Sequence, residues 1–132
     1  MEDKQKQSKS RHNQRIAAIE ILYGMDLRGD EALTPTEDEF TNALVEGVTK
    51  YRSTIDGHIE PQLERWTLKR LSFVDRAILR VATYEMYGLN TPAEIAINEA
   101  LELTRRFTDE GDNKAVHFNN AVLDKIKRAL KK

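Results

Sequence analysis

The side chains that could carry chemistry in this chain are cations, amides and an aromatic ring, gathered near its two ends. His12, His58 and His117 are scattered, and none has a second ligand three or four residues away, the helical spacing that brings two ligands to one metal. No histidine is positioned in the sequence to activate a Ser or Thr hydroxyl. We therefore predict a protein that is not an enzyme and that needs no metal and no cofactor.

One group of these side chains lies near the start of the last predicted helix. His117, Asn120 and Lys125 fall close to Phe118 in the sequence. Such residues suit the recognition of single-stranded RNA, because cations pair with phosphates and aromatic rings stack on bases. Alternatively, Phe118 packs into the core, since it begins the apolar arc of its helix. The sequence leaves both interpretations open.

The other group lies on the first predicted helix. Arg11, Gln14 and Arg15 occupy its first turns, and Lys9 comes just before it. Cations at the N-terminus of a helix oppose the helix dipole, so they lower its stability slightly. A phosphate group bound there would relieve this effect. The placement therefore favours a partner that carries phosphates.

Charge is distributed unevenly, although the formal net charge is only −1. Residues 1–15 carry a net charge of +3 and residues 114–132 a net charge of +5, whereas residues 26–46 carry −6. Two basic ends around an acidic middle favour a polyanionic partner if the ends meet in space. Frayed, solubilising tails are the alternative explanation.

The element that must position these residues is a helix over 71–89, with Ser72 as its N-cap. At about 100° per residue, apolar side chains cover most of its circumference. The remaining polar strip consists mainly of Arg76, Arg80, Thr83 and Tyr87. A helix of this kind is normally central and surrounded by other helices.

Glu85 falls inside the apolar arc of this central helix, between Val81 and Ile78. Burial of a carboxylate is unfavourable unless the group is paired or hydrogen-bonded. We predict that Glu85 is buried and bonded either to backbone N–H groups at a helix start or to Asn98 or Asn120. The role of the residue is then structural.

The first and last helices have clear boundaries in the sequence. Ser8 or Ser10 provides the N-cap of the first, and Gly29 ends it. The last helix begins near Asp112 or Asn113. No segment alternates between apolar and polar residues over a useful length, so the chain is predicted to be all-α.

Two further helices begin with a Thr-Pro signal followed by a glutamate, at residues 34–37 and 91–94. In the earlier one, apolar residues recur at helical steps from Phe40 to Ile55. This spacing predicts one continuous helix that runs on to Pro61, where the proline breaks it.

Length and composition fit a small soluble protein. The chain has 132 residues, of which 39% are apolar and 33% charged, and it contains no cysteine. No apolar run approaches the length of a membrane span, and the first residues, MEDKQKQSKSR, contain no hydrophobic region that could serve as a signal peptide. We predict a flexible basic tail at 1–9, a single helical RNA-binding domain at 10–132, and a cytoplasmic location.

Several segments resemble the NusB family of bacterial transcription antitermination factors. They are RIAAIEILYGMDL at 15–27, DRAILRVATYEM at 75–86, EIAINEALEL at 94–103 and FNNAVLD at 118–124. Their order and spacing match the family from about residue 9 to residue 130.

The resemblance implies two small three-helix bundles packed together and a function without catalysis. NusB-like proteins bind the boxA element of leader RNA together with NusE, a ribosomal protein of the small subunit. They help RNA polymerase to read through terminators, including in rRNA transcription. Partners implied for this chain are therefore boxA-type single-stranded RNA, NusE and the RNA polymerase elongation complex.

The resemblance also assigns roles to individual positions. It carries RNA contact over to the N-terminal basic helix and to two aromatic residues, and NusE contact to the start of the central helix. The predicted RNA-binding residues are Lys9, Arg11, Gln14, Arg15, Tyr23, Phe118, Asn120 and Lys125. Of these, Asn120 and Lys125 are taken from the pattern around Phe118 and not from the resemblance. The NusE-binding pair is Asp75 and Arg76.

This chain departs from the family pattern at several places. Its basic cluster is diluted to KSRHNQR, Asn119 stands where an apolar residue is typical, and Ala121 where glycine is typical. Two alternatives stay open: a stand-alone relative of the NusB-type domain of some RNA methyltransferases, and a small helical protein that homodimerises without boxA binding. The sequence does not distinguish a monomer from a homodimer.

Overall fold

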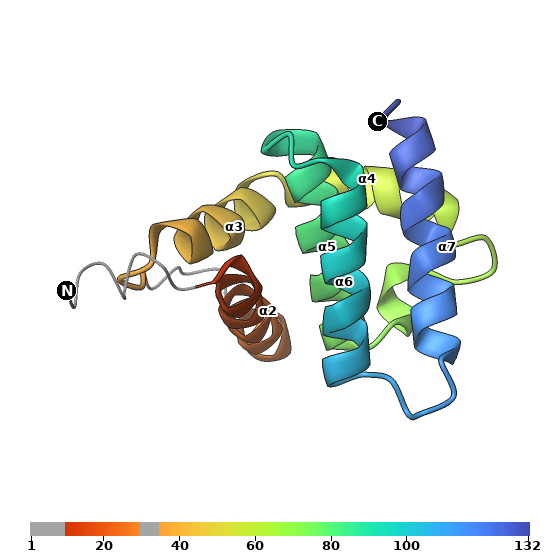
Figure 1. Cartoon of the computed structure of the whole chain (residues 1–132), viewed down its shortest axis with the longest axis horizontal. Helices are drawn as coiled ribbons and strands as arrows, with labels where there is room; N and C mark the ends of the chain where they lie inside the picture. The colour runs from red at the N-terminus through yellow and green to blue at the C-terminus, as the bar shows by residue number, and fades with distance from the viewer. Residues whose placement is uncertain (1–9, 30–34) are drawn as a thin grey trace.

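The computed structural model describes residues 10–29 and 35–132, and all regular structure within these ranges is helical (Figure 1). The prediction of an all-α chain is confirmed. The predicted tail at 1–9 lies outside the described residues. The α-helices are α2 (Arg11–Arg28), α3 (Glu39–Lys50), α4 (Arg52–Ile59), α5 (Phe73–Gly88), α6 (Ala93–Phe107) and α7 (Lys114–Ala129), with short 3₁₀ helices η1 (Glu60–Gln62) and η2 (Leu68–Arg70) between α4 and α5.

Helix α5 is the central element, as its sequence predicts, and it packs against every other α-helix described. Helices α2 and α3 lie on one side of it, and α6 and α7 lie together on another (Figure 1). Helix α4 follows α3 and contacts α5 and α7. The two groups of helices thus share α5.

The burial of α5 follows from its sequence. Ser72 caps it through a hydrogen bond that its Oγ accepts from the Asp75 N–H at 3.0 Å. Every residue from Ala77 to Met86 is buried. Each large apolar side chain removed from water contributes about 1.5–3 kcal/mol, so this one helix supplies a large share of the core.

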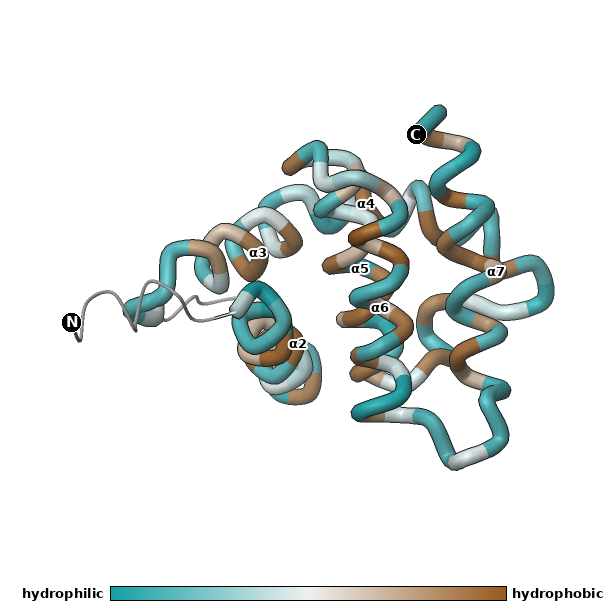
Figure 2. Tube along the Cα trace, in the orientation of Figure 1, coloured by the Kyte–Doolittle hydropathy of each residue, from teal (hydrophilic) through white to brown (hydrophobic). Residues whose placement is uncertain are grey.

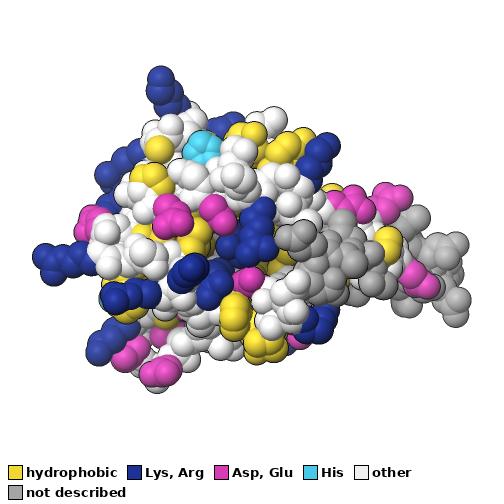
Figure 3. Space-filling view, turned by 180° about the vertical axis from the view of Figure 1, so that it is seen from behind, with side chains coloured by type: hydrophobic (Ala, Val, Ile, Leu, Met, Phe, Trp, Pro, Cys, Tyr) yellow, Lys and Arg dark blue, Asp and Glu magenta, His cyan; other side chains and the backbone are white. Residues whose placement is uncertain are grey.

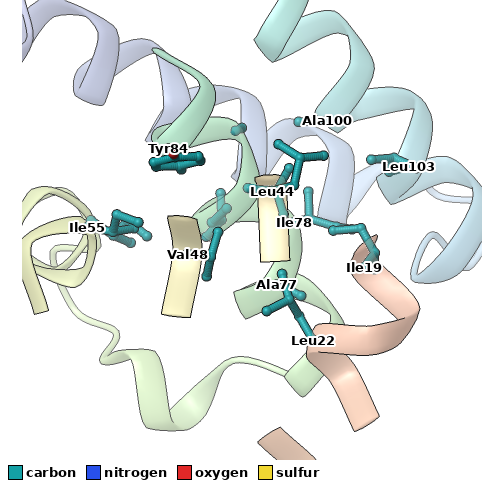
Figure 4. Close-up of a cluster of buried hydrophobic side chains, with 14 of the residues drawn as sticks. Ile19, Leu22, Leu44, Val48, Ile55, Ala77, Ile78, Tyr84, Ala100 and Leu103 are labelled. Carbon is teal, nitrogen blue, oxygen red and sulfur yellow. The ribbon is translucent and has the colours of Figure 1, made fainter. Parts of the chain in front are cut away.

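The other helices turn an apolar stripe toward α5 and a polar surface outward (Figure 2). A close-up shows buried hydrophobic side chains of α5 meeting those of its neighbouring helices (Figure 4). Those labelled are Ile19 and Leu22 from α2, Leu44 and Val48 from α3, Ile55 from α4, Ala77, Ile78 and Tyr84 from α5, and Ala100 and Leu103 from α6.

The predicted ends of α2 are confirmed. Ser10 Oγ accepts a hydrogen bond from the Asn13 N–H, and Gly29 adopts the left-handed conformation with φ of 66°. The predicted start of α7 is confirmed as well, with Asn113 at its N-cap.

The start predicted for the next helix, at 34–37, is wrong. Helix α3 begins at Glu39, and its N-cap is Asp38, which accepts a hydrogen bond from the Thr41 N–H. The reason is local: the side chain of Asn42 accepts from the backbone N–H of Thr36, which folds the Pro-Thr segment into a turn before the helix.

The predicted continuous helix is also divided. It changes direction at Tyr51, whose φ of −104° and ψ of 20° are not helical. The Tyr51 ring packs on Tyr84 of α5, which explains why the chain leaves the helical path there. Pro61 lies inside η1 and ends the α-helical run, as predicted.

The predicted N-cap of α6, Thr91, does not cap that helix, whose N-cap is Pro92. Thr91 donates its hydroxyl to Glu85 Oε1 at 3.2 Å, and the helix begins two residues later.

Candidate nucleic-acid interface

The start of α2 exposes one described cation, Arg11. Its guanidinium lies 4.0 Å from the centre of the Phe40 ring and donates to Gln14 Oε1 at 2.8 Å. These contacts hold the charge at the surface, where it can meet a phosphate. Lys9 lies outside the described residues.

Gln14 faces inward and is only 7% exposed. Its side-chain amide donates to both carboxylate oxygens of Asp38, at 3.0 and 2.9 Å. Because Asp38 caps α3, this contact joins the start of α2 to the start of α3.

Arg15 is buried and forms a two-point ion pair with Glu85. Its Nε and Nη2 atoms donate to the two carboxylate oxygens at 2.8 and 2.7 Å. The side chains are 5% and 1% exposed. Burial opposes the charge of Arg15, but the hydrogen bonding of Arg15 to Glu85 and the charges of Glu85 and Glu99 outweigh it and raise the pKa of Arg15.

The predicted burial of Glu85 is therefore confirmed, while its predicted partners are wrong. Neither Asn98 nor Asn120 supplies the donor; Arg15 does, from a position 70 residues earlier in the chain. The side chains of Gln14 and Arg15 both make contacts that fix α2, so each has a structural role, and their predicted contact with RNA stays a prediction.

A pair of aromatic rings lies at the other predicted position on α2. Tyr23 is 38% exposed and meets Phe73, the first residue of α5, edge to face at 6.4 Å. The guanidinium of Arg76 lies 4.5 Å from the centre of the Phe73 ring. Arg76 also donates to the carbonyl oxygens of Lys69 and Leu71, which holds η2 against the start of α5.

A groove of about 300 Å³ opens between the η2 region and the first turns of α7. Its aromatic residues are Phe118 and Trp66, which meet edge to face at 6.3 Å; Trp66 is 48% exposed. Phe118 is half-buried, packs on the core and lines the groove. Core packing and a role at the binding surface are therefore compatible for this residue. The lining consists of Trp66, Arg70, Leu71, Ser72, Asp75, Lys114, Ala115, Phe118 and Asn119.

Asp75, predicted to contact NusE, lies at the floor of this groove as a junction between helices. Its Oδ1 accepts from Thr108 Oγ1 at 3.0 Å and from Asn119 Nδ2 at 3.3 Å. Asn119 is 1% exposed and donates to Thr104 Oγ1 as well. The polar residue at a typically apolar position is thus used to join α5, α6 and α7.

The last two predicted RNA contacts lie on α7 but do not line the groove. Asn120 is exposed. Lys125 pairs with Glu64, and its hydrogen bond and charge lower the pKa of that fully exposed carboxyl. Among the described residues, no group of three or more acidic or histidine side chains could hold a metal ion.

Trp66, Arg70 and Lys114 were not predicted. Each lies in a short connection or at a helix end, where periodicity carries no signal, and only the approach of η2 to α7 brings them together. The presence of the chain's single tryptophan, a residue type enriched at interfaces, is the one signal in the sequence that could have found this groove.

The fold and this surface define a small all-α protein whose exposed aromatic and cationic groups suit binding to nucleic acid or protein. No helix among the described residues has the length and apolar character needed to cross a bilayer.

Known proteins resemble the chain over most of its length. The NusB family matches residues 12–128. The transcription antitermination protein NusB of Geobacillus kaustophilus (strain HTA426) is 42% identical over 131 residues, covering 92% of this chain and 98% of that protein. T. maritima NusB has a TM-score of 0.79 and 34% identity, covering 91% of this chain and 92% of that one. A crystal structure of the antitermination factors NusB and NusE in complex with dsRNA has a TM-score of 0.76 and 26% identity, covering 90% of this chain and 96% of that one. The chain belongs to the NusB family.

Proposed function

We propose that this protein is an antitermination factor that binds boxA-type leader RNA together with NusE and promotes read-through by RNA polymerase, including in rRNA transcription. Family membership supports the proposal, as does the solved relative that holds NusE and RNA. It acts in the cytoplasm as one helical domain, residues 10–132, and works by binding rather than by catalysis.

The observation that carries the proposal is the groove between Trp66 and Phe118. Two aromatic rings stand beside the cations Arg70 and Lys114, and Lys114 is 88% exposed. A base stacked on an aromatic ring contributes about 1–3 kcal/mol, and each phosphate paired with a cation adds salt-dependent affinity. The Tyr23–Phe73 pair adds two further aromatic rings at the start of α5, next to the guanidinium of Arg76.

NusE docks, in this proposal, where Asp75 and Arg76 begin α5. Both side chains make hydrogen bonds within the chain, Asp75 with Thr108 and Arg76 with the Leu71 carbonyl. They therefore fix the shape of the docking surface more than they contact NusE directly. RNA and NusE then meet at one end of α5, so each partner can add to the affinity of the other.

The test is a titration of a labelled boxA-type RNA and a scrambled RNA of equal length, with and without NusE. Trp66→Ala is the best variant, because this side chain is half exposed and its loss leaves the core intact. We expect at least about fivefold weaker binding, the equivalent of one lost base stack. Ile95→Ala on α6 is the matched control, since Ile95 is an equally exposed large apolar residue, at 49%.

Equal affinity for both RNAs, unaffected by NusE, would contradict the proposal. If the folded protein bound neither RNA and sedimented as a dimer, the alternative of a helical homodimeric protein would replace it.

A further inference from the structure

One face of α5, here called the strip, runs from the Tyr23–Phe73 pair to a second aromatic surface at the other end of the helix, and Arg80 in its middle is buried. Phe73, Arg76, Arg80 and Tyr87 recur at steps of three, four and seven residues, so they share one face. With a rise of 1.5 Å per residue, about 21 Å separates Phe73 from Tyr87 along the helix.

The second aromatic surface, here called the tyrosine step, consists of Tyr51, Tyr84, Tyr87 and His58. Tyr51 stacks on Tyr84 at 6.2 Å with an interplanar angle of 17°, and it meets Tyr87 edge to face at 6.2 Å. His58 lies 5.5 Å from Tyr87. Tyr51 and Tyr87 are 37% and 38% exposed, so each keeps part of its ring in solvent.

Two glycines hold the tyrosine step in place. A Cβ atom added to Gly47 would lie 2.0 Å from Cζ of Tyr84, and one added to Gly88 would lie 2.4 Å from its Cε1. The buried Tyr84 ring therefore fills a niche that exists only because both residues lack side chains. Its outer side then serves as the platform on which Tyr51 stacks.

A cavity of about 400 Å³, here called the arginine pocket, lies on the strip between the two aromatic surfaces. Its floor is apolar and its polar rim includes Asp26, Lys50, Arg52 and Arg80. The apolar part of the lining is formed by Leu22, Met25, Val48 and Ala77.

Cations outnumber carboxylates around this pocket. Arg52, Arg76 and Arg80 converge on the single carboxylate of Asp26, at 3.3, 3.6 and 3.5 Å. Arg80 is also held by Asp56. Lys50 adds a fourth cation against these two carboxylates, which leaves the pocket positively charged. Lys and Arg side chains gather near the middle of the face shown in Figure 3, next to hydrophobic ones.

We propose that the tyrosine step and the arginine pocket bind a further segment of single-stranded RNA. A base stacks on Tyr51 and Tyr87, and the adjoining phosphate lies beside Lys50 and Arg52. This inference rests on the proposed function, because it extends the strand beyond the Trp66–Phe118 groove.

Lys50 supplies the geometric link between ring and cation. Its Nζ lies 5.3 Å from the centre of the Tyr51 ring, and the same side chain lines the arginine pocket. Arg52 is 44% exposed at its side chain and contacts Asp26 through one nitrogen, so a phosphate can reach its remaining N–H groups. A cation beside an exposed ring is the arrangement that holds a base and its phosphate together.

The experiment compares a short boxA-type RNA with one extended far enough to cover a further ~20 Å, the span set by the helical rise. Wild-type protein should bind the extended RNA at least about fivefold more tightly, as one added stack gives. Tyr51→Leu and Lys50→Gln should remove that advantage and leave binding of the short RNA unchanged. Lys50→Gln should also reduce the salt slope for the extended RNA by about one unit.

Arg106→Gln is the matched control, because Arg106 is an exposed cation 5.7 Å from the Phe107 ring on α6, away from both surfaces. It should not change the advantage of the extended RNA. Photo-crosslinking of the extended RNA should label Tyr51 or Tyr87, and the label should disappear with the short RNA. Melting curves of each variant confirm that it is folded.

The outcomes separate this inference from the proposed function. If wild type binds the short RNA, but the extension adds nothing or Tyr51→Leu keeps the advantage, the inference is wrong and the proposed function stands. An equal loss in Arg106→Gln would mean general charge attraction and would also overturn it. If Tyr51→Leu weakens NusE binding in the absence of RNA, the surface serves a protein instead. If wild type binds no RNA, the proposed function and the inference fail together.

Discussion

Replacing Arg15 with methionine removes the cation that neutralises a buried carboxylate. Glu85 is 1% exposed, and without Arg15 its remaining side-chain contact is the Thr91 hydroxyl at 3.2 Å. Breaking a buried ion pair from one side reduces stability by about 3–5 kcal/mol, because it leaves the other charge without a partner. This is a large part of the roughly 5–15 kcal/mol that stabilises a typical domain.

The expected result for Arg15→Met is a fall in Tm of roughly 10–20 °C, the equivalent of that loss for a chain of this size. Glu85→Met should cause a similar fall, reduced by the extent to which Glu99, 3.7 Å from Arg15, takes over the guanidinium. The double variant should be much more stable than the two single losses predict, since apolar residues of similar volume often replace a buried pair with little loss.

Urea denaturation followed by circular dichroism gives these free energies, and the double-mutant cycle gives the coupling energy of the pair. Single variants within about 0.5 kcal/mol of wild type would refute the reasoning, since that is the range of surface substitutions. Strictly additive losses would also refute it, because they would show that the two side chains do not interact.

Three further outcomes are expected. Gly47→Ala should lower the free energy of unfolding by about 1–3 kcal/mol, because the added methyl group overpacks against the Tyr84 ring. Gly57 has open space around it, so Gly57→Ala should be neutral or stabilising by about 0.5–1 kcal/mol. Thermal melts measure both. Phe118→Ala should lower both stability and RNA affinity, as melts and titrations of one sample will show, because its ring faces the core and the groove; a loss of stability alone would remove it from the RNA surface. Arg11→Gln should reduce the salt slope of RNA binding by about one unit with unchanged helicity, and an unchanged slope would show that no phosphate lies there.

Local signals explain which parts of the fold could be predicted. The Ser72 and Gly29 boundaries rest on backbone chemistry within one helical turn, so the sequence contains everything needed to find them. The burial of Glu85 follows from the period of α5 alone. Its partner could not be found in this way, because Arg15 looks like any surface cation until α2 is placed against α5.

The candidate site was less predictable, because it forms between elements. Trp66 precedes η2 and Phe118 lies on α7, and neither neighbourhood in the sequence indicates a shared groove. The break at Tyr51 was missed for a related reason: the apolar spacing continues across it, while its cause is a ring on α5. Tertiary contacts override local preference at both places.

The Arg15→Met/Glu85→Met double variant also decides whether Arg15 takes part in RNA binding. In the single variant, lost stability and lost contact would be confounded, since unfolded protein binds no RNA specifically. In the double variant no buried charge lacks a partner, so α2 should again pack stably against α5, but no cation remains at position 15. If Arg15 serves only to fix α2, the folded double variant should bind RNA with wild-type affinity and an unchanged salt slope. If Arg15 leaves Glu85 to contact a phosphate, affinity should fall and the slope should drop by about one unit. The burial of this side chain, at 5% exposed, predicts the first result.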